Sequence, residues 1–561
     1  MQGEWTVELH EYACYDGVGL HQLITQRQVS PAEVEAAARS ALHLADETVN
    51  GLAGPVFSPA LEHAKNGPFS GVPFLIKDVP MAKGVPFSVG SASLQGIVAQ
   101  HDTDLMTRFR AAGLVTLGVS IMSEMGLSFS TETIKHGPTR NPWNLQRGVG
   151  GSSGGAAALV AAGAVPIAHA NDSAGSIRIP ASCCGLVGLK PGRGRIPCGP
   201  DTGEPGFGMS YDFAVTRTLR DAAHLLDAIQ GPGCGDKYSA PAPARPYVQE
   251  LRGDPRPMRI AVTTQAWSGS DVEPEVAAIT VEAAQMLEQA GHVVPTASPP
   301  VDWDAVLHTM RTEAVSNASS FLLAPRPPDP TKLEAVSRQI LSEVAAYTAM
   351  DLIRGFTAQN QVTRSVGAFF TQYDALITPT LGQLPAPHGA LQYNNPAHTL
   401  NTWLRTLFDY GPFTAVFNIS GQPAISLPLG RSRSGLPIGV QIITRTGRED
   451  LLIQGRHTSN GRCRGRTAAP PSSSETRTRS GSAESRSQAD QAFFRTTTLR
   501  DATSRRGEDA SALYAVGVTG RRRWRPGRRS PAQGWAVRGF DRGMGTCRVH
   551  STRSADPRGD G

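Results

Sequence analysis

The sequence predicts an α/β fold, with a central mixed β-sheet covered by α-helices on both sides and a disordered, basic C-terminal tail. Short apolar runs bounded by turn residues, typical of buried strands, alternate with longer segments that have helical periodicity. The chain has 561 residues, of which 40% are hydrophobic and 18% charged, so it can bury a large core and has the composition of a soluble enzyme. Because the composition changes abruptly after Gln454, we predict a domain of residues 1–454 and a tail of residues 455–561.

Local signals define the predicted elements. Residues 30–33, Ser-Pro-Ala-Glu, form a capping box with Pro at the first helical position, ahead of an apolar-periodic helix at residues 34–44. The apolar run at residues 71–79 is a buried strand that ends in Lys77 and Asp78. Further helices are predicted at residues 103–112, 156–162, 280–290, 303–323 and 332–353. Further strands are predicted at residues 114–117, 259–262, 375–378, 424–427 and 438–443.

The net charge of +6 hides an asymmetry between the two parts of the chain. Residues 455–561 hold 22 Arg, no Lys and 9 acidic residues, a net charge of +13, which leaves −7 on the first 454 residues. With no Ile and two Leu, this tail cannot bury enough apolar surface to offset the entropy of ordering. We interpret this Lys-free, Arg-rich tail as the product of a reading-frame shift near codon 455.

The sequence predicts a cytoplasmic protein that does not bind a membrane. Its N-terminus has neither the basic nor the apolar region of a secretory signal, and no apolar run is long enough to span a bilayer. The seven cysteines include no CxxC pair, and no HExxH stretch occurs. We therefore expect buried thiols in a reducing compartment and no metal site.

Two loops of small residues carry the chemistry of the chain. The first, residues 148–155, is rich in Gly and Ser, and the second, residues 171–181, contains Ser176. Such loops let backbone N–H groups converge on a phosphate or on an oxyanion. No Lys follows either glycine cluster as in a Walker loop, and no clean GxGxxG follows a strand, so we expect no nucleotide cofactor.

Acyl transfer needs a nucleophile, a base and donors for an oxyanion. The sequence indicates no strand-to-helix nucleophile elbow with a His base, so a serine–lysine system remains an alternative. Lys77 can serve as the base only if burial or neighbouring positive charge lowers its pKa. Its position at the end of an apolar strand favours such burial. We expect the side chain of Asp78 to point the other way, because neighbours in a strand alternate.

Three separated motifs resemble the amidase signature family, in the family's order and spacing. They are the strand at residues 71–78, the region of residues 148–197, and the paired segments 421–424 and 435–441. The resemblance covers the chain from about residue 15 to residue 454, and it implies a final amphipathic helix that the frame-shifted tail would replace. It implies an amidase that hydrolyses a carboxylic amide to an acid plus ammonia or an amine, with no metal or organic cofactor.

The resemblance also implies a Ser–cis-Ser–Lys triad. Ser176 would be the nucleophile that forms the acyl-enzyme, Ser152 the bridging serine after a cis peptide bond, and Lys77 the base. The oxyanion hole would be formed by the backbone N–H groups of four consecutive residues, Ser173, Ala174, Gly175 and Ser176. Asp172 and Arg178 would brace the loop that carries the nucleophile, and Ser153 would form hydrogen bonds around the site.

One position departs from the family pattern. The family usually has two glycines before the nucleophile, and here the first is Ala174, which tolerates a positive φ poorly. The Ala-Gly-Ser-x-Arg variant is similar to that of the bacterial amidases resembling 6-aminohexanoate-cyclic-dimer hydrolases, as are residues 110–113 and 139–144. This similarity leaves the amide substrate open.

Two alternative functions are weighed against amide hydrolysis. The amidase-like subunit of a glutamine-dependent tRNA amidotransferase shares the triad, but Ala174 and the sequence before Ser152 fit it poorly. Nucleic acid could bind the basic tail, where residues 521–529 combine Arg with Trp524, but an altered reading frame explains that segment better. The expected partner is a small-molecule amide, and a homodimer is left open.

Overall fold

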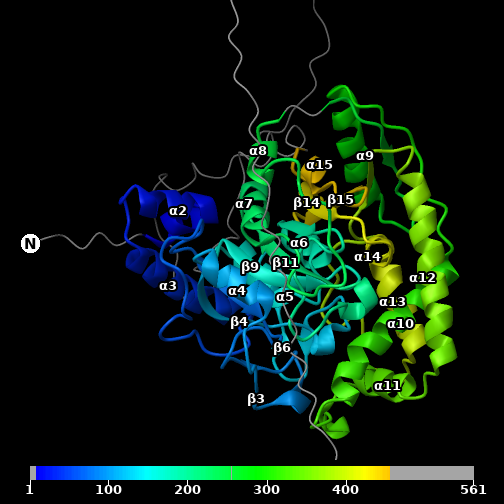
Figure 1. Cartoon of the computed structure of the whole chain (residues 1–561), viewed down its shortest axis with the longest axis horizontal. Coiled ribbons are helices and arrows are strands. Elements are labelled where there is room, and N and C mark those ends of the chain that lie inside the picture. Colours follow the sequence, from blue (N-terminus) through cyan, green and yellow to red (C-terminus); the bar gives the residue numbers. More distant parts are fainter. Residues whose placement is uncertain (1–7, 254–255, 455–561) are drawn as a thin grey trace, which may run out of the picture. The chain divides into compact units, whose positions relative to one another are not determined.

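The computed structural model describes residues 8–253 and 256–454, which are built around one large sheet (Figure 1). In the described part of the chain this sheet has nine strands: β1 (Pro73–Lys77), β4 (Val115–Ser120), β9 (Ile167–Asp172), β10 (Val187–Lys190), β11 (Tyr211–Thr216), β12 (Ile260–Val262), β13 (Ala375–Pro379), β14 (Ala424–Arg431) and β15 (Pro437–Thr444). Their order is β12-β13-β15-β14-β10-β11-β9-β1-β4. The pairs of β1 with β4 and β9, and of β12 with β13, are parallel, and the other neighbours are antiparallel. The predicted mixed sheet is confirmed.

Helices cover both sides of this sheet, as predicted (Figure 1). The α-helices of the described residues are α1 (Leu9–Cys14), α2 (Gly17–Thr25), α3 (Pro31–Val49), α4 (Asp104–Ala111), α5 (Gly154–Ala161), α6 (Arg178–Cys184), α7 (Leu219–Ile229), α8 (Tyr247–Glu250), α9 (Pro274–Gln289), α10 (Trp303–Leu322), α11 (Ala335–Val344), α12 (Ala349–Phe369), α13 (Leu400–Tyr410), α14 (Ala415–Ser420) and α15 (Glu449–Gln454). Short strands and 3₁₀ turns complete them: β2 (Pro86–Phe87), β3 (Ile97–Val98), β5 (Glu132–Thr133), β6 (Gly137–Pro138), β7 (Arg140–Asn141), β8 (Asn144–Gly148), η1 (Ala92–Leu94), η2 (Glu124–Gly126), η3 (Pro205–Gly208) and η4 (Pro330–Lys332).

The capping box predicted for the first long helix is present at the start of α3. Ser30 Oγ accepts a hydrogen bond from the Glu33 backbone N–H at 3.2 Å, and the Glu33 carboxylate accepts one from the Ser30 N–H at 2.7 Å. These two bonds satisfy donors that the first turn of a helix would otherwise leave free. The local sequence therefore defines this helix start correctly.

The single helix predicted at residues 332–353 is wrong. α11 ends at Val344, and α12 begins at Ala349 and continues to Phe369. Thr348 and Asp351 form a second capping box, in which each side chain accepts a hydrogen bond from the other's backbone N–H at 3.3 and 3.0 Å. This box gives α12 an N-terminus of its own, which apolar periodicity did not indicate.

Three central strands, β9, β10 and β11, were missing from the prediction. β9 has the sequence Ile-Ala-His-Ala-Asn-Asp, which lacks the β-branched and aromatic run that is typical of strands. It pairs with all six residues of β11, from Tyr211–Asp172 to Thr216–Ile167. Pairing and burial in the middle of the sheet, rather than local propensity, therefore produce β9.

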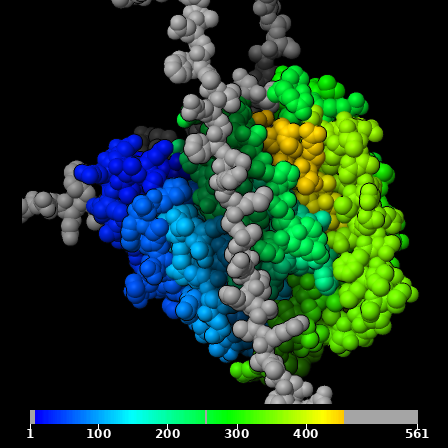
Figure 2. Space-filling view, viewed as in Figure 1, coloured from blue at the N-terminus to red at the C-terminus, as the bar shows by residue number. Residues whose placement is uncertain are grey.

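The position of β1 places the predicted base. β1 lies between β4 and β9 and is parallel to both, and its five residues are all buried. Because parallel strands end at the same edge of a sheet, Lys77 lies beside the loop that follows β9. α10 packs against α11, α12 and α13. α10, α11 and α12, coloured green to yellow-green, lie on the opposite side of the described unit from the blue N-terminal helices (Figures 1 and 2).

The predictions for residues 455–561, including their disorder, their separation as a domain and their origin in a frame shift, lie outside the described residues. Within residues 8–253 and 256–454, no helix combines the length and apolar character needed to cross a bilayer.

A buried ion pair attaches the last described helix to the rest of the chain. In α15, the Glu449 carboxylate accepts hydrogen bonds from Nε and Nη2 of Arg195, both at 3.1 Å, and from the Gly192 N–H at 3.0 Å. The Arg195 side chain is 1% exposed and that of Glu449 is fully buried. The ion pair thus joins α15 to the loop after β10.

We predict that Glu449→Ala lowers the free energy of unfolding by about 3–5 kcal/mol, because it leaves a buried guanidinium without its counter-charge. Asp450→Ala is the matched control, since Asp450 pairs with Arg448 at a partly exposed position and should cost about 0–1 kcal/mol. Urea denaturation of the full chain, followed by far-ultraviolet circular dichroism, measures both changes. Equal losses in the two variants would contradict a special role for the buried pair.

Candidate active site

Lys77 is the centre of a compact hydrogen-bonded group. Its Nζ donates to Ser152 Oγ at 2.7 Å, to Ser153 Oγ at 2.9 Å and to Asn171 Oδ1 at 2.5 Å. Its backbone N–H donates to Nδ1 of His169, whose Nε2 lies 3.1 Å from Asp212 Oδ1. All three donor positions of the lysine head group therefore have oxygen partners, and one of them is the predicted bridging serine.

The neighbouring Asp78 points away from this group, as predicted. Its carboxylate accepts hydrogen bonds from the N–H and the hydroxyl of Ser88, at 2.7 and 2.6 Å, and from the Gly90 N–H at 2.9 Å. Asp78 therefore braces the loop after β1, and the lysine has no carboxylate partner within ion-pair distance among the described residues.

Burial controls the protonation of Lys77. The side chain is fully buried, and burial lowers the pKa of Lys77 to about 7, although the carboxylates of Asp212, Asp172 and Asp78 act to raise it. Desolvation disfavours the charged form of a lysine, which explains the direction of the shift. A substantial fraction of the lysine is therefore neutral near neutral pH and can accept a proton from Ser152.

Ser152 and Ser176 lie in the loops that precede α5 and α6. The peptide bond between Gly151 and Ser152 is cis, as the family resemblance implied. Ser176 is 4% exposed and lines a cavity with Ser173 and Ala174. Among the described residues no hydrogen bond joins the two serine hydroxyls, and catalytic hydrogen bonds commonly tighten only when substrate binds.

The loop that carries Ser176 is held between two buried charges. Asp172 at the end of β9 accepts hydrogen bonds from Nε and Nη2 of Arg178 at 2.9 and 2.8 Å, and from the Ile177 N–H at 3.1 Å. Burial would raise the pKa of Asp172, but the Arg178 guanidinium and the Asn418 amide lower it to about 2. Asp172 is therefore ionised at all working pH values, and the ion pair fixes both ends of residues 173–177.

Residues from the C-terminal half of the domain complete this support. Arg178 also donates to the Thr414 carbonyl, to Gln441 Oε1 and to Asn418 Oδ1, at 2.9, 2.7 and 2.5 Å. Thr414 Oγ1 donates to the carbonyl of Ala174 at 2.5 Å, which orients the peptide unit that precedes Gly175. The loop is thus braced from α14 and β15 as well as from α6.

The backbone N–H groups of the predicted oxyanion hole are available to a ligand. Within the described part of the chain, none of the N–H groups of Ser173, Ala174, Gly175 and Ser176 donates to a protein acceptor. Ala174 does not have a positive φ, whereas Gly175 has φ +148°. The departure from two glycines therefore causes no strain at Ala174.

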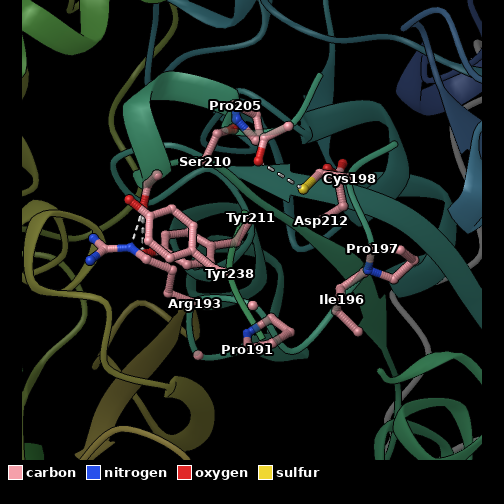
Figure 3. Close-up of a pocket in the computed structure, with 14 residues that line it drawn as sticks. Pro191, Arg193, Ile196, Pro197, Cys198, Pro205, Ser210, Tyr211, Asp212 and Tyr238 are labelled. Atoms are coloured by element: carbon pink, nitrogen blue, oxygen red, sulfur yellow. Dashed lines mark hydrogen bonds between the residues drawn. The ribbon is translucent and has the colours of Figure 1, made fainter. Parts of the chain in front are cut away.

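A second cavity adjoins the site (Figure 3). Arg193, Cys198 and Tyr238 line it together with Ser210 and Asp212, which flank Tyr211 at the start of β11 (Figure 3). The two cavities meet at one hydrogen bond: the hydroxyl of Ser173, which lines the first cavity, donates to Oγ of Ser210, which lines the second, at 2.8 Å. Lys77, Ser152 and Ser176 do not line this second cavity.

A family model described as Amidase matches residues 33–453. The chain belongs to the amidase family. The 6-aminohexanoate-cyclic-dimer hydrolase of Paenarthrobacter ureafaciens is 36% identical over 468 residues, covering 78% of this chain and 93% of the hydrolase. A structure of 6-aminohexanoate cyclic dimer hydrolase complexed with substrate is 34% identical, with a TM-score of 0.75, and covers 83% of this chain and 98% of that chain. An acylamidase of Rhodococcus erythropolis is 33% identical over 392 residues, covering 70% of this chain and 81% of the acylamidase.

These matches confirm the resemblance seen in the three motifs, and they confirm amide hydrolysis over the two alternatives. This amidase is a hydrolase, and its expected partner is a small-molecule amide. The basic tail, on which the nucleic-acid alternative rested, lies outside the described residues.

The structure adds residues to the site that the sequence did not single out. Asn171 precedes Asp172 in the predicted small-residue turn, so a polar residue at the end of β9 was the available signal. Asn418 and Glu313 come from segments with no motif, and only the fold brings them near residues 172–176. The expectation of buried thiols holds for Cys183 and Cys184, but Cys14 and Cys234 are exposed and Cys198 is half-buried, so it is wrong for these three.

We predict that Gly175→Ala impairs the amidase, because a Cβ there would lie 2.6 Å from both Ile179 Cδ1 and Thr414 Oγ1 at a φ that favours glycine. Strain of about 1–3 kcal/mol in the loop should lower kcat/KM at least about tenfold. Ala174→Gly is the matched control and should leave kcat/KM within about threefold, since Ala174 has no positive φ. Amide turnover by both variants tests this, and a greater loss in Ala174→Gly would contradict it.

Proposed function

We propose that this amidase hydrolyses a small carboxylic amide through an acyl-enzyme on Ser176, with Ser152 and Lys77 as the proton relay. The observation that carries the proposal is the 2.7 Å hydrogen bond between Lys77 Nζ and Ser152 Oγ in a buried site. A lysine at the end of β1 has this contact only because the Gly/Ser loop before α5 folds against it. Ser173, Ala174 and Ser176 line the adjoining cavity, and their backbone N–H groups donate to no acceptor among the described residues.

The reaction would proceed in two halves. Neutral Lys77 takes the proton of Ser152, Ser152 takes that of Ser176, and Ser176 Oγ forms a bond to the amide carbon. The N–H groups of residues 173–176 stabilise the oxyanion. The relay then protonates the leaving nitrogen, the C–N bond breaks, and ammonia or an amine departs. Water attacks the ester by the same relay and releases the acid.

The supporting residues act through the positions of these groups. Ser153 accepts from Lys77 and donates to the Asn171 carbonyl at 3.3 Å, so it keeps the lysine head group aligned with Ser152. Asp172 and Arg178 hold the loop that presents the N–H groups. We therefore expect changes at these positions to act through the geometry of the relay and the oxyanion hole.

The substrate class includes cyclic and linear amides as candidates. The cavity next to Ser176 has mainly apolar walls, which fits an aliphatic chain, and the relative from Paenarthrobacter ureafaciens is named for the cyclic dimer of 6-aminohexanoate. The cytoplasmic location stays a prediction from the sequence, and a homodimer stays open.

We predict that a fluorophosphonate probe labels the parent enzyme and fails to label Ser176→Ala, because the probe forms its bond with the activated hydroxyl. Ser93→Ala is the control, since Ser93 lies away from the site with its hydroxyl on the Asp329 carbonyl. Intact-protein mass spectrometry measures the adduct. Equal labelling of Ser176→Ala and the parent would show that another residue is the nucleophile.

We predict that kcat/KM rises with pH through about 7 and then levels, because burial lowers the pKa of Lys77 to about 7 and only the neutral amine accepts a proton. Below that pH, kcat/KM should fall about tenfold per pH unit, as the protonated fraction grows. Lys77→Ala should lower kcat/KM by about 10²–10⁴-fold.

The exposed Lys65 supplies the control for this experiment, and Lys65→Ala should keep the parent profile. Initial rates between pH 5 and 9 in buffers of constant ionic strength give the curves. A flat profile across this range, or near-normal turnover by Lys77→Ala, would exclude Lys77 as the base.

A further inference from the structure

The cavity that Ser176 lines has mainly apolar walls. Its walls come largely from α10, α11 and α13, including Met310, Ile340, Leu400, Leu404, Leu407 and Phe408. Of the residues that line it, Glu313 of α10 alone carries an acidic or basic side chain. A single ionisable group in a mainly apolar pocket is an arrangement by which binding sites fix the orientation of a ligand.

The Glu313 carboxyl group is buried without a cationic partner. The residue is 5% exposed, and no ion pair of the described residues includes it. Its polar neighbours are neutral: Asn317 Nδ2 donates to Oε1 at 2.6 Å, and the Ser173 hydroxyl, whose own proton goes to Ser210 Oγ, lies close to the carboxyl group. Burial raises the pKa of Glu313 to about 7, although Ser173 and Asn317 act to lower it. A buried acid without a counter-charge destabilises the fold, so the fold gains nothing from this carboxylate.

The position of Glu313 relates it to the reacting carbonyl. Its partner Ser173 contributes both the hydroxyl that contacts Glu313 and the first N–H of the run that ends at Ser176. A carboxylate has about four acceptor positions, and Asn317 uses one of them. Glu313 therefore offers unused acceptor capacity on the wall of the cavity, close to the proposed oxyanion hole.

We propose that Glu313 determines specificity by accepting a hydrogen bond from an ammonium group that the substrate carries near its scissile amide. This inference rests on the proposed role of Ser176. An ammonium supplies the counter-charge that Glu313 lacks, and hydrogen bonds between charged partners are about twice as strong as neutral ones. The apolar walls would contact the alkyl chain that links the ammonium to the amide. The ammonium could belong to the acyl group or to the leaving amine.

Pairs of amides that differ only by ammonium and methyl test this proposal and distinguish its two sources. The acyl pairs are glycinamide with propanamide, 4-aminobutanamide with pentanamide, and 6-aminohexanamide with heptanamide. The amine pair is N-(2-aminoethyl)hexanamide with N-propylhexanamide. In at least one pair, the parent should have a higher kcat/KM for the amide that carries the ammonium than for the amide that carries the methyl group. Glu313→Gln should lower kcat/KM for that ammonium-bearing amide by about 10- to 100-fold. The same variant should leave the methyl member within about threefold, because Gln keeps the size of the side chain.

Glu282→Gln, at an exposed position of α9, is the matched control and should leave every pair unchanged. Thermal unfolding of Glu313→Gln should occur at or above the parent temperature, because the variant removes an uncompensated buried acid. Equal losses for both members of each pair, with a lowered unfolding temperature, would reveal a structural role and overturn the proposal. A parent that favours the methyl member in every pair would also overturn it.

Fluorophosphonate labelling separates failure of this inference from failure of the proposed function. A parent that is labelled at Ser176 and hydrolyses amides without any dependence on Glu313 refutes the specificity role alone. A parent that is neither labelled nor active on any amide refutes the proposed function, and the role of Glu313 with it.

Discussion

The buried ion pair between Asp172 and Arg178 joins the parts of the chain that meet at the site. Asp172 ends a central strand, Arg178 begins α6, and the guanidinium reaches Thr414, Asn418 and Gln441 in the last quarter of the domain. Both charged side chains are fully buried, and such burial is tolerable only when hydrogen bonds satisfy each group. The loop between the two residues is short, so its backbone donors are held in place from both ends.

The same site contains two buried ionisable groups that lack an ion-pair partner in the described residues. Burial lowers the pKa of Lys77 and raises that of Glu313, and both reach about 7. The contrast with Asp172, whose pKa is lowered to about 2, follows from the presence or absence of an adjacent counter-charge. One ion pair therefore stabilises the frame of the site, while the unpaired groups remain able to change protonation near neutral pH.

Local sequence predicts the parts of this enzyme that depend on local chemistry. The capping box at Ser30, the buried strand ending at Lys77 and the loops around Ser152 and Ser176 all carry short-range signals. β9, the break before α12 and the position of Glu313 could not be predicted in this way. β9 depends on pairing with β11, and Glu313 would look like an ordinary surface charge on a helix until the fold buries it.

The attachment of α15 has a consequence for the order in which the domain is completed. Arg195 and Glu449 are separated by 254 positions, so the loop after β10 is synthesised long before its counter-charge exists. At about 5–20 residues per second, that interval lasts about 10–50 s. During this time the guanidinium must stay in water, and the loop that carries it cannot close against the sheet without a large desolvation cost. The contact therefore delays final closure until nearly the whole domain has left the ribosome.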